Sequence, residues 1–299
     1  MDRSVLRIGH LFNITHGPAL VLRETEELAH SLRRLSVEWR AFSAGPSVVE
    51  ALLGGAVDVV YSGPSPILAA HLRSRGTALR VLSGACSGGA GLVVQPGISL
   101  TNPQVLNGRT VSSPQLGNTQ DVSLRTWLAR HGMSDVERGG QVRVLPLPAS
   151  ECFNQFRLGR VHAAWVPEPT LSRIVALLGG VLAVDERDLW PQRRFASTLL
   201  AARTEYLAAA PDTLNTLLQA HVAVTQRLAH GDARSRALVR ASVDRAMGRP
   251  LAPAVYAGAF AHCDYTVDPL IDTVRAQCEA AQRLEFLPAG TTLGLLSAR

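Results

Sequence analysis

Hydroxyl and amide side chains gather where a short apolar strand meets a helix, within residues 110–131. Asn118 is a favourable N-cap residue, and Asp121, three positions later, can return a hydrogen bond to the backbone amide of Asn118, as in a capping box. The first amides of a helix lack partners within the helix and carry a partial positive charge. The stretch therefore predicts a helix N-terminus that can bind an anion, although an ordinary helix cap explains the same residues.

Polar or glycine-rich loops also precede or follow other expected elements, at residues 13–17, 62–66 and 86–91. Glycine lets a backbone approach a ligand closely, but it also suits a tight turn without any ligand. Each loop follows an apolar run of strand length. In open α/β sheets such loops meet at the carboxyl ends of the strands, where ligands bind.

Motifs for metal binding and nucleophilic catalysis are missing from these loops. No His or carboxylate pair in a candidate loop has the i, i+3 or i, i+4 spacing of a metal site, and no Gly-x-Ser-x-Gly motif is present. Cys86 has no base beside it in the sequence, but His16 could approach it in space, so an enzyme is an open alternative. We expect no catalytic residue, no metal and no cofactor.

The composition is that of a globular protein. Of the 299 residues, 46% are hydrophobic and 18% are charged, which excludes a disordered chain. This length favours two lobes over a single core. The net charge of +6 comes from arginine, because the chain has no lysine, and these arginines are scattered without interleaved aromatic residues. Nucleic-acid binding therefore has little support. No run of the sequence reaches the ~18 apolar residues of a membrane span. We also expect a monomer.

The cysteines and the first residues bear on the cellular compartment. The four cysteines have no metal-ligand spacing, and a Cys263–Cys278 disulfide depends on a geometry that sequence does not reveal. A core strand is expected from Val5 onward, with no secretion signal before it. Either the protein stays in the cytoplasm, or the sequence is a mature segment with an added start Met.

Strand and helix patterns alternate along the chain, which predicts an α/β fold with largely parallel sheets. Residues 55–65 align without gaps with residues 159–169, and each segment carries an apolar strand into a loop that contains proline. This correspondence indicates two lobes of similar design whose loops face each other across a cleft. Helices with clear bounds are expected over residues 18–34, 47–53, 150–157, 211–229, 233–247, 252–262 and 269–284.

The chain is expected to cross between the two lobes twice. Lobe I then comprises residues 1–95 plus 203–299, and lobe II comprises residues 96–202. The hinge segments are expected near residues 92–97 and 197–204. Two such crossings would let the lobes rotate about a hinge.

Several segments of the chain match a known family. They are Asn13-x-Thr15-His16 with residues 18–20, then residues 44–47, Asp58-x-x-Tyr61-x-Gly63-Pro64, and residues 87–89, 113–121, 165–169 and 185–191, with Tyr265-x-x-Asp268-Pro269 near the end. This pattern resembles the substrate-binding proteins of ABC importers, in the nitrate, sulfonate, taurine and bicarbonate class that is also called NMT1-like. The resemblance implies a type II periplasmic-binding-protein fold, with a ligand clamped in the cleft as the lobes close.

The same resemblance implies a function and a setting. The protein would be a solute-binding component without enzymatic activity, periplasmic or otherwise extracytoplasmic, with a permease and an ATPase as partners. Its ligand would be a small oxyanion or zwitterion, with an aliphatic, taurine-like sulfonate favoured. The ligand-binding residues carried over from the family pattern are Asn13, Thr15, His16, Ser62, Gly63, Pro64, Ser65, Ser87, Gly88, Gln115, Gly117, Asn118, Thr119, Trp165 and Glu168.

Three of these assignments have more than one interpretation. No arginine lies in the loops, so neutral donors and helix dipoles would hold the anion. Glu168 would repel an anion, unless it points away, pairs with Arg173, or meets the cationic group of a zwitterion. His16 is either a ligand contact or an internally bonded loop histidine, and contact is favoured.

Two other classes of function stay open at this point. Some cytoplasmic enzymes share this fold, including lyases and proteins of pyrimidine synthesis, although the Cys and His cluster of the latter is missing here. A ligand-sensing module for a signalling partner is a weaker alternative, because no DNA-binding helix pair is evident.

Overall fold

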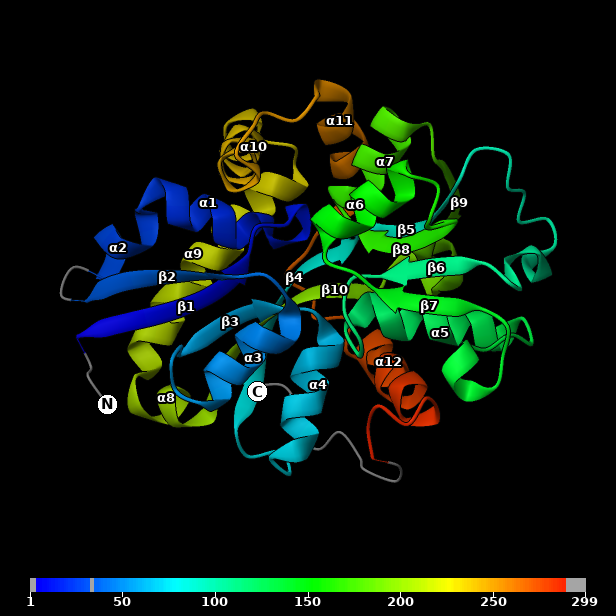
Figure 1. Ribbon diagram of the computed structural model, residues 1–299. Helices are drawn as coiled ribbons and strands as arrows, with labels where there is room; N and C mark the ends of the chain where they lie inside the picture. The colour runs from blue at the N-terminus through cyan, green and yellow to red at the C-terminus, as the bar shows by residue number, and fades with distance from the viewer. Residues whose placement is uncertain (1–3, 33–34, 289–299) are drawn as a thin grey trace.

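The computed structural model describes residues 4–32 and 35–288 and divides their strands between two sheets. Figure 1 shows the two sheets side by side, with helices around each of them. The first sheet has the order β11-β4-β10-β3-β1-β2 and the second has the order β7-β6-β8-β5-β9. The strands are β1 Val5–Leu11, β2 Ser36–Phe42, β3 Val59–Ser62, β4 Leu79–Gly88, β5 Ala90–Val94, β6 Thr110–Ser113, β7 Arg143–Pro146, β8 Ala163–Pro167, β9 Val181–Asp185, β10 Ala196–Arg203 and β11 Cys263–Tyr265.

Helices cover both faces of each sheet, so the central strands, such as β3 and β5, are buried on two sides, whereas the edge strands β2 and β9 are partly exposed. The helices are α1 Gly17–Thr25, α2 Glu27–Leu32, α3 Gly45–Leu53, α4 Pro64–Arg73, α5 Thr119–Arg130, α6 Ala149–Arg157, α7 Thr170–Leu178, α8 Thr204–Ala209, α9 Pro211–Ala229, α10 Ala233–Met247, α11 Pro253–His262 and α12 Ile271–Arg283. Short 3₁₀ helices are η1 Ile14–His16, η2 Pro103–Leu106, η3 Val136–Arg138, η4 Glu186–Leu189 and η5 Pro191–Arg193.

This architecture confirms the predicted α/β fold with two lobes, but the sheets are mixed rather than largely parallel. Strands β1, β2 and β3 are parallel, as are β6, β7 and β8. In contrast, β10 runs antiparallel to β3 and β4, and β5 runs antiparallel to β8 and β9. A buried apolar strand has the same sequence pattern in either direction, so hydrophobicity could not reveal this reversal.

The chain passes from the first sheet to the second between β4 and β5. Gly88 and Gly89 form this step with φ of 76° and 74°, a region that suits glycine. A Cβ atom at Gly88 would lie 2.5 Å from the carbonyl oxygen of His262, so the close packing there also requires glycine. The chain returns between β9 and β10, through η4 and η5.

Sheet membership therefore differs from the expected lobe boundaries at two strands. β5 belongs to the second sheet and β10 to the first, whereas residues 1–95 and 96–202 were expected to divide the lobes. The two passages lie at residues 88–90 and 186–195, next to the expected hinge segments rather than within them. The antiparallel pairing of each strand with its new sheet causes this shift.

Other predicted elements are confirmed with small changes. The helix expected over residues 18–34 is divided into α1 and α2 at Glu26, which has φ of 54°, and its expected end at residues 33–34 lies outside the described residues. Strand β11 and helix α8 were not predicted. All four cysteines are free and buried, so Cys263 and Cys278 do not form a disulfide.

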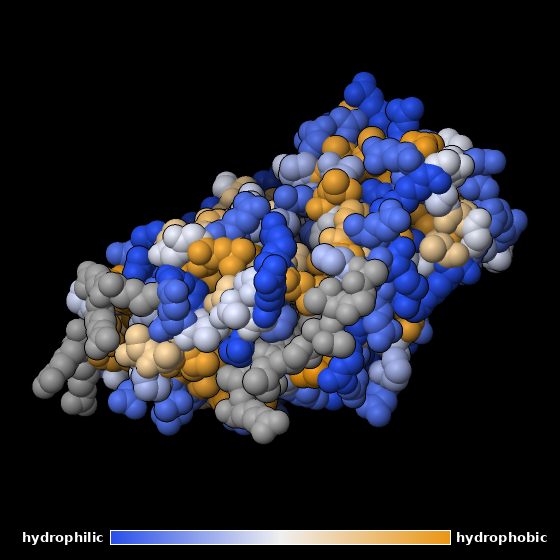
Figure 2. All heavy atoms as spheres, turned by 90° about the horizontal axis from the view of Figure 1, so that it is seen from below, coloured by the Kyte–Doolittle hydropathy of each residue, from blue (hydrophilic) through white to orange (hydrophobic). Residues whose placement is uncertain are grey.

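The outer surface carries hydrophobic side chains in small groups among hydrophilic ones on the face drawn in Figure 2. Among the described residues, no helix has both the length and the apolar character needed to cross a membrane.

Candidate ligand-binding site

A cavity of about 650 Å³ lies between the two sheets. Its walls include the loops that follow the parallel strands β1, β2 and β3 of the first sheet and β6, β7 and β8 of the second. The carboxyl ends of these strands thus face a common space, which is where open α/β sheets bind ligands. Figure 1 shows the two groups of strands approaching each other around this region.

The N-terminus of α5 lies at one wall of the cavity, and Asn118 is its N-cap, as predicted. The Asn118 Oδ1 atom accepts a hydrogen bond of 2.9 Å from the amide of Asp121. Asp121 does not return a bond to the amide of Asn118. It accepts instead from the amide of Gly117 at 2.9 Å and from the Ser113 hydroxyl at 2.6 Å. The amide of Asn118 bonds to the carbonyl of Gln115 at 3.2 Å, so Asp121 holds the whole loop rather than the cap alone.

Arg125 completes the anchoring of this loop. Its Nε donates to Asp121 at 3.0 Å and its Nη1 donates to Asp135 at 2.6 Å. The apolar face of α5, with Leu124 and Trp127, packs into the core of the second lobe, as expected. Asp121 and Arg125 therefore hold the loop before α5 in place from the interior of the second lobe, while residues of the same loop line the cavity.

The N-terminus of α4 touches the N-terminus of α5 across the cavity. The amide of Ser65 donates to the Thr119 hydroxyl at 3.3 Å. A Cβ atom at Gly63 would lie 2.5 Å from the same hydroxyl oxygen, so only glycine permits this approach. Two helix N-termini, one from each sheet, thus converge at one place, and their dipoles favour negative charge there.

His16 lines the cavity as a neutral imidazole. Burial, followed by the influence of His10, lowers the pKa of His16 to about 3. The amide of Leu11 donates to Nδ1 of His16 at 3.3 Å. Because Nδ1 accepts this bond, the ring proton is on Nε2, which can donate to an acceptor. His16 is consequently a neutral hydrogen-bond donor rather than a cation.

Arg173, which sequence reasoning did not place in the site, supplies a cation to the cavity. Only 3% of this residue is exposed, and its guanidinium carbon lies 4.4 Å from the ring centroid of Phe153. Its Nε atom has no hydrogen-bond partner, and no carboxylate within residues 4–32 or 35–288 lies at ion-pair distance from it. Burial, with a smaller contribution from Arg249, lowers the pKa of Arg173.

This arginine could have been suspected from its position. It lies in the first turn of α7, just beyond the loop that follows β8, and only residues of that loop were expected to contact a ligand. An unpaired buried cation is costly, so the structure favours an anion beside it. Arg173 thus adds a cation to a cavity wall from which neutral donors and helix dipoles were expected to hold most of an anion.

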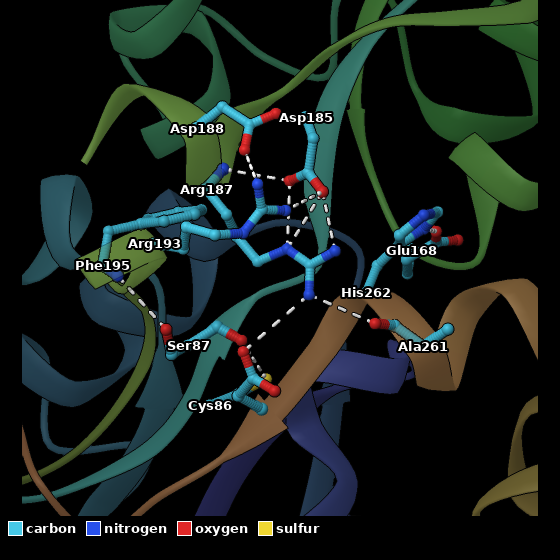
Figure 3. A network of polar contacts seen from close by, with 11 residues as sticks. Cys86, Ser87, Glu168, Asp185, Arg187, Asp188, Arg193, Phe195, Ala261 and His262 are labelled. Atoms are coloured by element: carbon cyan, nitrogen blue, oxygen red, sulfur yellow. Dashed lines mark hydrogen bonds and ion pairs between the residues drawn. The ribbon is translucent and has the colours of Figure 1, made fainter. Parts of the chain in front are cut away.

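Glu168 also lies at the cavity wall, but its carboxylate is bonded internally and is fully buried. It accepts from the amide and the hydroxyl of Ser172, at 3.0 and 2.8 Å, and from Nδ1 of His262 at 2.6 Å. The suggested pairing with Arg173 is absent from the described contacts. Figure 3 shows Glu168 beside His262, at the end of α11.

The network in Figure 3 also ties the return passage between the sheets to α11. Arg187 of η4 donates to Asp185 at 2.6 Å and to the carbonyl of Ala261 at 3.2 Å. On the same helix, a Cβ atom at Gly258 would lie 2.6 Å from the Ser172 hydroxyl, so α11 packs closely against α7. Helix α11 therefore connects the two lobes beside the cavity.

The residues expected to bind a ligand fall into two groups. Those that line the cavity are Asn13, Thr15, His16, Gly63, Gln115, Asn118, Thr119 and Glu168. Those that do not line it are Ser62, Pro64, Ser65, Ser87, Gly88, Gly117 and Trp165.

Two members of the second group have structural roles that explain their position. Trp165 points into the core of the second lobe, where its Nε1 donates to Glu186 at 2.7 Å. Ser87 accepts a bond of 3.1 Å from the amide of Phe195. In a strand, neighbouring side chains point to opposite faces, so a match to a motif does not tell which of them reach the cleft.

Cys86, the nucleophile that the sequence left open, is not among the residues that line the cavity. Cys86 is buried, and its thiol donates to the carbonyl of Ser87 at 3.3 Å. No group of three or more His, Cys, Asp or Glu side chains with metal-binding geometry occurs in the part of the chain that the structure describes.

The two lobes, the mixed sheets and the cleft between the strand ends define the type II periplasmic-binding-protein fold. The family model described as the NMT1-like family matches residues 2–242, and the chain belongs to this family. Two solved structures are similar in fold. The periplasmic nitrate-binding protein NrtA from Synechocystis PCC 6803 has a TM-score of 0.81 and 15% identity, with 97% of this chain and 84% of the other covered. The periplasmic aliphatic sulphonate binding protein SsuA from Escherichia coli has a TM-score of 0.79 and 19% identity, with 100% and 93% covered.

Curated relatives match parts of the chain at low sequence identity. Proteins of Brucella abortus, Brucella suis and Brucella melitensis, whose names describe them only provisionally as binding proteins, are 24% identical over 218 residues, which is 73% of this chain and 65% of theirs. The taurine-binding periplasmic protein of Escherichia coli is 27% identical over 139 residues, which is 46% of this chain and 41% of the other. This chain thus matches about 65% of the length of the Brucella relatives.

Proposed function

We propose that this protein is the solute-binding component of an ABC importer and that it binds an organic anion in the cavity between the lobes. The observation that carries this proposal is Arg173, a buried guanidinium that lines the cavity without a carboxylate partner in the described chain. A guanidinium offers two parallel N–H donors to a carboxylate, sulfonate or phosphate. The names of the similar proteins, which include nitrate, sulphonate and taurine binders, agree with an anionic ligand.

Neutral donors would complete the anion site. The Nε2 proton of His16 and the Thr119 hydroxyl both lie at the cavity wall. The amides that begin α5 add the partial positive charge of a helix N-terminus. The sulfonate class that the family resemblance suggested fits these donors, whereas a zwitterion such as taurine lacks a free carboxylate here, because Glu168 is already bonded to His262.

We further propose that the lobes rotate about the two passages at residues 88–90 and 186–195. The contact between Ser65 and Thr119 would form on closure and break on opening. A permease and an ATPase would be the partners, the setting would be extracytoplasmic, and the protein would act as a monomer without enzymatic activity.

A thermal-shift and calorimetry screen tests this function. Purified protein is exposed to nitrate, bicarbonate, taurine, alkanesulfonates, phosphonates and carboxylates, with neutral alcohols of matched size as controls. A ligand at 100 times its dissociation constant should stabilise the folded state by about 2.7 kcal/mol, which is measurable as a shift of a few degrees. Binding of anions without chemical change supports the proposal, whereas consumption of a ligand, or equal binding of the neutral controls, refutes it.

A further inference from the structure

The cavity is larger than a small inorganic or zwitterionic solute requires. Its volume is about 650 Å³ although the lobes already touch, through Ser65 and Thr119 at 3.3 Å and through His262 and Glu168 at 2.6 Å. At about 30 Å³ per water-sized atom, this space holds a solute of roughly twenty non-hydrogen atoms. Nitrate, bicarbonate or taurine would leave most of it to water.

Apolar side chains from both lobes form a large share of the wall. Leu11, Phe12 and Phe42 lie at the ends of the first-sheet strands, and Met247 approaches from the end of α10. From the second lobe, Leu147 lies beside three proline-containing loops. Such a wall gains free energy when it covers an apolar ligand body and gains nothing from a small hydrated anion.

The charged groups at the cavity wall are complementary to a ligand that carries one negative charge. Arg173 is a buried cation with no carboxylate partner among the described residues. The carboxylate of Glu168 is bonded to Ser172 and His262, and His16 is neutral. A second anionic group would have no cation, and a cationic group would have no free carboxylate.

From these observations we infer that the ligand is a large organic monoanion with an apolar body, rather than a small oxyanion or a zwitterion. This inference rests on the proposed function, because it assigns the solute class of the same cavity. The guanidinium accepts either a carboxylate or a sulfonate head, so the head group is a variable of the test.

Calorimetric titration of the wild-type protein with N-acylglycines tests whether the cavity binds an apolar ligand body. N-acetylglycine, N-hexanoylglycine and N-decanoylglycine share one carboxylate and one N–H group and differ only in chain length. Affinity should rise about fourfold for each CH₂ group that becomes buried. Decanesulfonate, compared with ethanesulfonate, repeats this comparison with the other head group.

Variants test whether the gain in affinity with chain length arises in the cavity. Met247→Ala should weaken N-decanoylglycine several-fold, and more than it weakens ethanesulfonate, because Met247 lines the apolar wall. The matched control is Leu158→Ala, since Leu158 is 51% exposed and does not line the cavity.

The failures of the two proposals are distinguishable. Tight binding of nitrate, taurine or ethanesulfonate with no gain from a longer body overturns the inferred ligand class and leaves the solute-binding function standing. Failure of every anion, large or small, to bind overturns both proposals.

Discussion

Replacing Arg173 by methionine separates its role in binding from any role in folding. Methionine keeps much of the length of the side chain and its packing against Phe153, but it removes the charge and the N–H donors. Loss of a hydrogen bond to a charged group costs about 1.5–3 kcal/mol. At 1.36 kcal/mol for each tenfold change, anion affinity should fall by roughly 10- to 150-fold.

The unliganded protein should respond in the opposite way. Arg173 is 3% exposed and has no carboxylate partner in the described chain, so its charge opposes folding when no ligand is bound. The melting temperature of the unliganded Arg173→Met protein should therefore equal or exceed that of the wild type. A residue with a merely structural role would show the reverse pattern, with a lower melting temperature and intact affinity.

Isothermal titration and differential scanning calorimetry measure both quantities on the same samples. Arg173→Lys keeps the charge without the planar donor pair and should have intermediate affinity. Arg157→Met removes an exposed arginine at the other end of α6 from the cavity and should change neither quantity. Unchanged anion affinity in Arg173→Met would refute the assignment of this arginine as the anion anchor.

Three more predictions concern lobe contact and buried carboxylates. Gly63→Ala should weaken binding at least tenfold, because the new Cβ lies 2.5 Å from the Thr119 hydroxyl oxygen and holds the lobes apart. In titrations, adding Thr119→Ala to Gly63→Ala should return the affinity to that of the Thr119→Ala single variant, and an affinity that stays below that value would contradict this steric explanation. Burial raises the pKa of Glu186 to about 7, so its ionisation lowers the stability of the folded protein as the pH rises from 4.5 to 7. In urea unfolding over this pH range, the free energy of unfolding of Glu186→Gln should therefore fall by about 3 kcal/mol less than that of the wild type. Parallel pH profiles of the two proteins would refute this prediction. His262→Leu should lower the free energy of unfolding by about 1–3 kcal/mol, because the buried Glu168 carboxylate loses its hydrogen-bond partner. Adding Glu168→Gln to His262→Leu should recover part of this loss. A His262→Leu protein as stable as the wild type would contradict the importance of this bond.

Short-range features of this protein were predictable because local physics determines them. The N-cap at Asn118, the apolar face of α5 and the core strand of β1 follow from neighbouring residues and their spacing. The carboxyl-end loops that line the cavity follow from the alternation of strands and helices.

Contacts between distant parts of the chain were not predictable from these patterns. Glu168 and His262 are 94 residues apart, so no local rule shows that they bond to each other instead of Glu168 pairing with Arg173. The partnerless state of Arg173 is likewise a property of everything packed around α7. Trp165 was likewise expected to contact a ligand, but its side chain lies in the core of the second lobe, where it bonds to Glu186.

The sequence by itself determined the fold class, the main helices and strands, and the neutral donors at the N-terminus of α5, since each depends on residues close together in the chain. Only the tertiary structure decided the direction of β5 and β10, the two passages between the sheets, and the charge balance of the cavity. The physical reason is that strand direction and the pairing of buried charges depend on which distant surfaces come together, and the energies of those contacts leave no periodic signal in the sequence.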